Sequence, residues 1–199
     1  MRPVRLTRAE QQALTRERLL AAAERVLAGH GYSGASIDLI TAQAGYSKGA
    51  IYSNFESKEA VFLELLRVYM ERDMAELERI VGLAPQQLSA ALNAWLETMH
   101  CDSDCPLLVT ELQLHARRNP AFAERYYALQ EQQTRALARI LERFFEAQSV
   151  PLPMDPRDLA GCMTALAHGL SLQHPQAEPG APSVAGRVIG AMLKLLTQR

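Results

Sequence analysis

The sequence predicts an all-helical protein of about nine helices, and three observations support this fold class. Apolar residues recur at helical spacing along most of the 199 residues, whereas the alternating pattern of a β-strand is almost absent. A capping Ser or Thr, or a proline, precedes most of these apolar segments, as is typical of helix starts. The composition, 48% hydrophobic and 22% charged, is that of a globular chain able to bury a core.

The first helix is expected to begin after Thr7. This residue and Glu10 form a T-x-x-E capping box, in which each side chain accepts a hydrogen bond from the backbone of the other. An approximate apolar stripe then continues to Gly29 and Gly31, where we expect the helix to end.

The next three helices are expected to begin at serines. Ser36 can cap a short helix that ends at Gly45, and Ser47 can cap a second one that reaches about residue 54. Ser57 can cap a long helix over about residues 58–81.

Prolines mark the starts of the following helices, since the first turn of a helix tolerates a residue without an N–H group. Helices five to eight are expected to start at or near Pro85, Pro106, Pro120 and Pro156. Residues 173–183 are expected to form a loop, and residues 184–196 a ninth helix.

Charge and targeting signals narrow the class of protein. Residues 1–58 carry a formal charge of +3 and residues 59–199 one of −4, which is a weak indication that the N-terminal part meets a polyanion. The sequence has neither a membrane span nor the apolar segment of a signal peptide, and its three cysteines are too few for a disulfide framework. We therefore expect a cytoplasmic protein without a membrane partner.

The two short helices around Gly45 have the spacing of a helix-turn-helix, whose second helix enters the major groove of DNA. Gly49 and Ala50 would allow a close approach to DNA, and Lys58 lies where a phosphate could bind. Five side chains could face the groove: Ser47, Lys48, Tyr52, Ser53 and Asn54. From spacing alone, a helical hairpin with an ordinary polar face remains an equal alternative.

Residues 15–63 closely resemble the N-terminal domain of TetR-type transcriptional regulators. The resemblance includes the core Ser-Lys-Gly-x-Ile-Tyr-x-x-Phe-x-Ser-Lys-Glu over residues 47–59. It implies a dimeric repressor with a DNA-binding domain over residues 1–57, in which a short third helix reads the major groove of a double-stranded operator. It also implies phosphate contacts by residues such as Ser36, Ser47, Tyr52 and Lys58.

Two positions depart from that family's pattern, and both bear on which bases are read. Tyr46 stands where a valine is frequent, and Asn54 where a histidine is frequent. The predicted DNA-binding residues are Ser36, Tyr46, Ser47, Lys48, Gly49, Tyr52, Ser53, Asn54 and Lys58.

Residues 111–145 resemble the regulatory domain of the betaine-responsive branch of the same family. The resemblance implies that residues 58–199 bind an unidentified small-molecule effector and dimerise, with the last two helices of each subunit forming a four-helix bundle. Small residues at intervals of four fit such an interface, although loose helix ends are the alternative; these residues are Gly161, Ala165, Gly169, Gly186 and Gly190. Residues placed to line an effector pocket, or simply to fill the core, are Trp95, Met99, Phe122, Tyr126, Met163 and His168.

An all-helical metalloenzyme of the di-iron kind is an alternative from a different class, and a DNA-binding adaptor controlled by a protein partner is a third. Glu97 and His100 form a Glu-x-x-His motif, and Glu111 and His115 lie one turn apart. A di-iron site needs a second Glu-x-x-His, which the sequence lacks. Cys101 and Cys105 could bind zinc or form a redox pair, but acidic neighbours favour inert thiols. We expect neither a metal, nor a cofactor, nor catalysis.

Overall fold

The structure, a computed structural model, describes residues 7–99, 105–174 and 183–198, which contain nine α-helices and no strand. The all-α prediction is confirmed. The helices are α1 (Arg8–Gly34), α2 (Ile37–Ala44), α3 (Lys48–Tyr52), α4 (Lys58–Val81), α5 (Pro85–Thr98), α6 (Cys105–Arg118), α7 (Pro120–Ala147), α8 (Pro156–Gln173) and α9 (Val184–Thr197).

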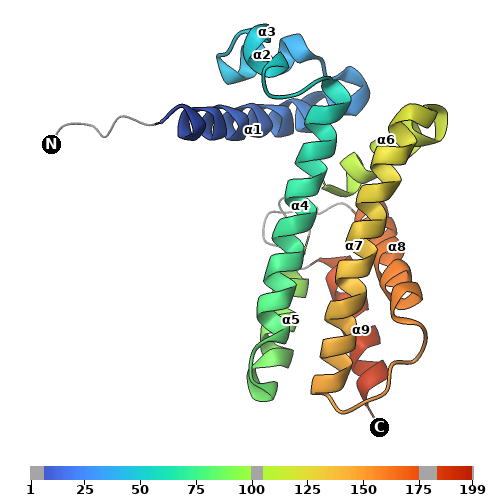
Figure 1. The fold of residues 1–199 in the computed structure, drawn as a ribbon. Coiled ribbons are helices and arrows are strands. Elements are labelled where there is room, and N and C mark those ends of the chain that lie inside the picture. Colours follow the sequence, from blue (N-terminus) through green and yellow to red (C-terminus); the bar gives the residue numbers. More distant parts are fainter. Residues whose placement is uncertain (1–6, 100–104, 175–182, 199) are drawn as a thin grey trace, which may run out of the picture.

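The helices are arranged as a head and a body (Figure 1). We call α1–α3 the head and α5–α9 the body. In the figure, α1 runs across the top of α4, with α2 and α3 beyond it, and α4 descends from the head along the body. This long helix therefore belongs to both parts.

The predicted helix starts are confirmed where the signal is local. The Thr7 hydroxyl accepts a hydrogen bond from the backbone N–H of Glu10 at 3.2 Å, and the Glu10 carboxylate accepts one from the Thr7 N–H at 2.7 Å. Ser36, Ser47 and Ser57 each accept a hydrogen bond from the backbone three residues later. Such caps satisfy donors that a helix leaves free at its first turn.

The prediction that the first helix ends near Gly31 is wrong, because α1 resumes after an interruption there. Gly31 has φ 65° and ψ 173°, a conformation that is open to glycine and strained for other residues. The next backbone N–H, that of Tyr32, donates to the carboxylate of Glu111 on α6. One more turn of helix follows and ends at Gly34.

Two hydrophobic clusters form the core. The head cluster contains buried residues of α1–α4 and, in addition, residues of α6 and the start of α7 such as Leu112, Phe122 and Tyr126. The body cluster joins the second half of α4 to α5, the second half of α7, α8 and α9. The packing thus divides the chain differently from the predicted boundary after residue 57, because α6 completes the core of the head.

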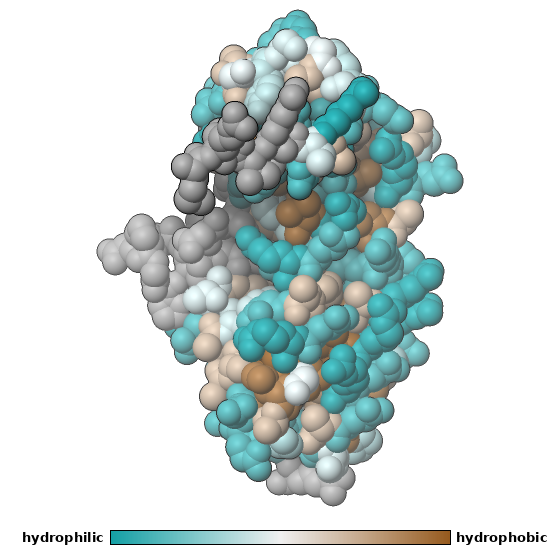
Figure 2. All heavy atoms as spheres, turned by 60° about the vertical axis from the view of Figure 1, so that its left-hand side comes forward, coloured by the Kyte–Doolittle hydropathy of each residue, from teal (hydrophilic) through white to brown (hydrophobic). Residues whose placement is uncertain are grey.

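Hydrophilic residues cover much of the face that Figure 2 shows, and hydrophobic residues gather in smaller areas between them. Among the helices of the described residues, none is both long and apolar enough to cross a membrane.

Candidate nucleic-acid interface and internal cavity

The helix-turn-helix is held by a tight turn and a small core. Gly45 ends α2 in the left-handed region, at φ 71°, and its N–H donates to the carbonyl of Thr41. The side chains of Ile40, Ile51 and Phe55 are buried beneath the two short helices. This packing fixes the orientation of α3 on the head.

α3 and its two capping residues present an exposed polar surface. Of the predicted DNA-binding residues, Ser47, Lys48, Gly49, Tyr52 and Ser53 are all exposed, and Tyr52 is 58% exposed in spite of its large ring. The hydroxyl of an exposed tyrosine is suited to donate to a phosphate oxygen. The contacts of these residues with DNA stay predictions.

Lys48 forms an ion pair on this surface. Its Nζ lies 2.6 Å from Oδ1 of Asp38 on α2, and both side chains are exposed. The hydrogen bond to Asp38 raises the pKa of Lys48. An exposed pair of this kind contributes little stability, so Lys48 can exchange Asp38 for a group on DNA at small cost.

Ser36 and Tyr46 lie at the two ends of α2. The hydroxyl of Ser36 caps α2 by accepting a hydrogen bond from the N–H of Leu39. The hydroxyl of Tyr46 accepts one from Arg18 at 3.4 Å, which lowers the pKa of Tyr46. Arg18 is a cation beside the predicted interface that the sequence analysis missed.

The prediction for Asn54 is corrected by its hydrogen bonds. Its Nδ2 donates to the carbonyl of Ala50 at 2.8 Å, so the side chain folds back onto the end of α3. Its Oδ1 is buried and has no hydrogen-bond partner among the residues that the structure describes. Asn54 therefore closes the helix rather than reaching for a base.

Arg16, which the sequence analysis also missed, joins α1 to the end of α3. Its guanidinium donates to the carbonyl of Asn54 and pairs with Glu64 on α4, both at 2.8 Å, and lies 4.3 Å from the ring centre of Phe55. Hydrogen bonds from Arg67 and Arg16 lower the pKa of Glu64 to about 2. The helical pattern could have indicated this role, because Arg16 lies on the apolar side of α1, one turn before the buried Leu19.

Lys58 has partners inside the protein. Its Nζ donates to the carbonyls of Tyr32 at 2.7 Å and Ala35 at 2.8 Å, and lies 4.4 Å from the ring centre of Tyr32. Burial lowers the pKa of this lysine. The side chain thus satisfies carbonyls at the end of α1, and its phosphate contact stays a prediction.

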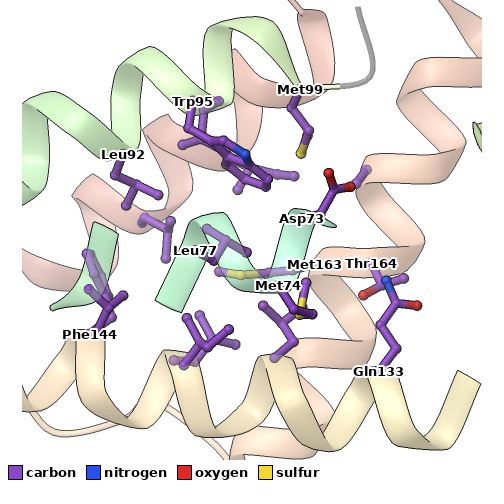
Figure 3. Close-up of a pocket in the computed structure, with 18 of the residues that line it drawn as sticks. Asp73, Met74, Leu77, Leu92, Trp95, Met99, Gln133, Phe144, Met163 and Thr164 are labelled. Atoms are coloured by element: carbon purple, nitrogen blue, oxygen red, sulfur yellow. The ribbon is translucent and has the colours of Figure 1, made fainter. Parts of the chain in front are cut away.

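A partly open cavity lies between α4 and the body helices α5, α7, α8 and α9 (Figure 3). The space open to the centre of a water molecule is about 100 Å³. Four of the six predicted pocket residues line it, namely Trp95, Met99, Met163 and His168. Asp73, Gln133 and Thr164 also line it and were missed by the sequence analysis, since polar residues on amphipathic helices look like surface positions.

The other two predicted pocket residues lie elsewhere. Phe122 and Tyr126 belong to the head cluster, where their rings stack with centres 6.1 Å apart. Phe122 also meets His115 of α6, edge to face. These two rings therefore do not line this cavity, contrary to the expectation, because the start of α7 packs under the head.

The predicted interface residues separate into two groups. On α8, Gly161 and Ala165 are exposed and Gly169 is half-buried; a Cβ at either glycine would have no neighbour within 4 Å among the described atoms. On α9, a Cβ at Gly186 would collide with the backbone of Leu96 on α5, and one at Gly190 would lie 3.4 Å from the Leu96 side chain. Gly186 therefore serves a close contact within the subunit, and the interface prediction is corrected for this residue. A Cβ at Gly190 would make only an ordinary van der Waals contact, so Gly190 and the residues of α8 stay predicted interface residues.

Three of the residues weighed as metal ligands, Glu111, His115 and Cys105, are described in other surroundings. The carboxylate of Glu111 accepts from Tyr32, and Nε2 of His115 lies 3.6 Å from Glu59. No group of three or more His, Cys, Asp or Glu suited to a metal occurs in the described part of the chain, although His100 and Cys101 lie outside it. Burial raises the thiol pKa of Cys105 to about 12, which keeps it protonated and unreactive.

Comparisons with known proteins agree with this architecture. A regulator of the TetR family from Agrobacterium tumefaciens has the same fold, with a TM-score of 0.69 over 94% of this chain and all of that chain at 21% identity. The regulator FadR of Bacillus subtilis, solved in complex with stearoyl-CoA, has a TM-score of 0.66 over 92% and 97% of the two chains at 18% identity. These likenesses concern the fold alone.

Sequence relatives point to transcriptional repressors. The repressor AcnR of Corynebacterium diphtheriae is 30% identical over 122 residues, and the repressor NicS of Pseudomonas putida 33% identical over 119 residues. Each match covers 56% of the relative and 57% or 56% of this chain, so the chain spans about half the length of these relatives.

Two family descriptions together cover most of the chain. Residues 19–65 match the bacterial regulatory proteins of the tetR family, and residues 84–197 match the C-terminal part of BetI-type transcriptional repressors. The first match contains the helix-turn-helix, and the second spans the helices of the body. The chain therefore belongs to the TetR family of transcriptional regulators.

Proposed function

We propose that this regulator is a repressor that binds a palindromic operator as a homodimer and is released by a small-molecule effector bound in the body. The observation that carries the DNA-binding part is the exposed polar surface of α3 and its caps, on a helix fixed by the buried Ile51. Phosphate contacts by Ser36, Ser47 and Tyr52 would set the register of the head on the duplex. Lys48 is the best-placed side chain to reach a base edge.

A footprint on the DNA that flanks the gene tests this function. A dimer should protect an inverted repeat, with two recognition helices in major grooves about 34 to 36 Å apart or a multiple of this. Protection without inverted symmetry, or binding no tighter than to unrelated duplexes, would contradict the proposal.

Tyr52→Ala should weaken binding to operator and to unrelated DNA by a similar factor, roughly ten-fold, because a phosphate contact carries affinity without sequence information. Fluorescence anisotropy with both duplexes measures the two affinities. Tyr127→Ala is the matched control, since Tyr127 is an exposed tyrosine on α7, away from α3. Should Tyr52→Ala lose affinity for the operator alone, Tyr52 would be reading bases instead.

Gly169→Leu should weaken the dimer about ten-fold or more, because the added side chain would hold the two subunits apart. A Cβ at Gly169 meets no described atom within 4 Å, so the variant should fold normally as a subunit. Analytical ultracentrifugation gives the dissociation constant, and Gly29→Leu on the exposed side of α1 is the control. An unchanged dimer in Gly169→Leu would place the interface away from α8.

A physical route for release connects the cavity to the head. Asp73 and Leu77 of α4 line the cavity, while the first residues of the same helix hold the head through Lys58. In addition, α6 contacts the interruption of α1 at Gly31, because Glu111 accepts a hydrogen bond from the N–H of Tyr32. A ligand that shifts α4 or α6 would change the separation of the two heads, and a typical coupling of about 1 to 3 kcal/mol would weaken operator binding roughly 5 to 150-fold.

A further inference from the structure

Three polar side chains gather at one end of the cavity in the body. In Figure 3, Asp73, Gln133 and Thr164 lie at one end, whereas Leu92 and Phe144 lie at the other. Most of the remaining wall is aliphatic or aromatic. A ligand that fits this space therefore has one polar end and an apolar remainder.

Asp73 contributes a largely buried carboxylate that has little positive charge near it to offset its own. Its side chain is 20% exposed, and the nearest cation is Nε of Arg72, 3.5 Å away, on a side chain that points largely into solvent. Burial raises the pKa of Asp73 in spite of the opposing influence of Arg72. A carboxylate in such a position is stabilised by a cation or a hydrogen-bond donor that enters the cavity.

Gln133 adds a second acceptor from α7. Its Oε1 is buried, and no donor within the described ranges reaches it. A buried amide oxygen without a partner costs free energy that a ligand N–H group can recover. The Asp73 carboxylate and Oε1 of Gln133 thus place two acceptors at the polar end.

The cavity offers no positive charge to an acidic ligand. None of the described residues that line it is Lys or Arg. Burial lowers the pKa of His168 to about 4, so this side chain is neutral near pH 7. A carboxylate or phosphate at the polar end would meet the like charge of Asp73, whose ion-pair partner Arg72 is largely exposed to solvent, and this is unfavourable in an apolar site.

We infer that the cavity takes a small amine whose protonated amino group donates hydrogen bonds to the Asp73 carboxylate and to Oε1 of Gln133. Its apolar part then extends between the helices toward Leu92 and Phe144. This inference depends on the proposed function only in calling the amine an effector, because the binding itself requires neither DNA nor a dimer.

Three probes of equal chain length test the polar end: hexylamine, hexan-1-ol and hexanoate. Trp95 is the only tryptophan of the chain and lines the cavity, so its fluorescence reports binding without a label. At pH 7 we expect hexylamine to bind at least about ten-fold more tightly than the alcohol, and hexanoate to bind most weakly, given the strength of charge-assisted hydrogen bonds.

Two variants assign the preference to residues. Asp73→Asn keeps the size of the side chain and should bring the affinities for amine and alcohol together, whereas Gln133→Leu should reduce the preference for the amine by a smaller factor. Asp158→Asn, an exposed acidic residue in the first turn of α8, should leave all three affinities unchanged. Circular dichroism establishes that each variant keeps its helical content.

Several results would overturn the inference. These are hexanoate binding as tightly as hexylamine in the unaltered protein, no response of Trp95 to any probe at millimolar concentration, or a preference that persists in Asp73→Asn. The comparison of the three probes in the unaltered protein tests the inference even if a variant fails to fold. A footprint without inverted symmetry would contradict the proposed function but would not bear on the amine site. The failure of one proposal can therefore be distinguished from the failure of the other.

Discussion

Gly186→Ala should lower the free energy of unfolding by about 3 kcal/mol, a large loss for a single methyl group. A Cβ at this position would collide with the carbonyl of Leu96, and backbone atoms cannot turn aside as a flexible side chain can. The start of α9 is also tied to α5 by the hydrogen bond from the Ser183 N–H to the Glu97 carbonyl at 2.9 Å. The variant must therefore separate two helices that are joined at the point of collision.

Denaturant unfolding followed by circular dichroism measures this effect, with Gly29→Ala as the control. Gly29 lies in α1 with no described atom near its Cβ position, so alanine there should be neutral or should stabilise by about 0.5 to 1 kcal/mol. Equal stability of the two variants would show that α9 does not approach α5 as closely as described.

Lys58→Met should lower the free energy of unfolding by about 2 kcal/mol, because it leaves the carbonyls of Tyr32 and Ala35 without their charged donor. Methionine keeps most of the aliphatic length, so the change tests the ammonium group rather than the packing. Lys48→Met on the same head is the control and should change stability by less than about 0.5 kcal/mol, since its ion pair with Asp38 is exposed.

DNA binding distinguishes the two roles considered for Lys58. If Lys58 only contacts a phosphate, its removal should leave the free energy of unfolding unchanged. It should also reduce the slope of the salt dependence of DNA binding by about one ion. A loss of stability with an unchanged salt slope identifies Lys58 as the residue that holds α1 against α4. The reverse pattern would restore the phosphate contact that the sequence predicts.

Local signals explain how much of the fold could be predicted. The caps at Thr7, Ser36, Ser47 and Ser57 depend on residues three positions away, and the structure has all four. The prolines at the starts of later helices act through their own geometry, which is again local. The order of the helices was therefore readable without knowledge of the tertiary structure.

The roles of individual side chains were harder to predict than the helix starts, because the residues that they contact are distant in the sequence. Lys58 bonds to carbonyls 23 and 26 residues away, which no spacing rule indicates. Phe122 has the character of a pocket wall, but its place under the head depends on how α6 and α7 dock. Gly186 was predicted to lie in the subunit interface, whereas the backbone that it approaches, that of Leu96 on α5, belongs to the same subunit.

The break in α1 at Gly31 bears on how this regulator can be recombined with others. The N–H that follows the break is capped by a carboxylate 79 residues further along the chain. The same helix, α6, supplies Leu108 and Leu112 to the core beneath α1. A chimera that joins residues 1–57 to a foreign effector domain would lose both, so a transplanted head needs α6 and the start of α7 to travel with it.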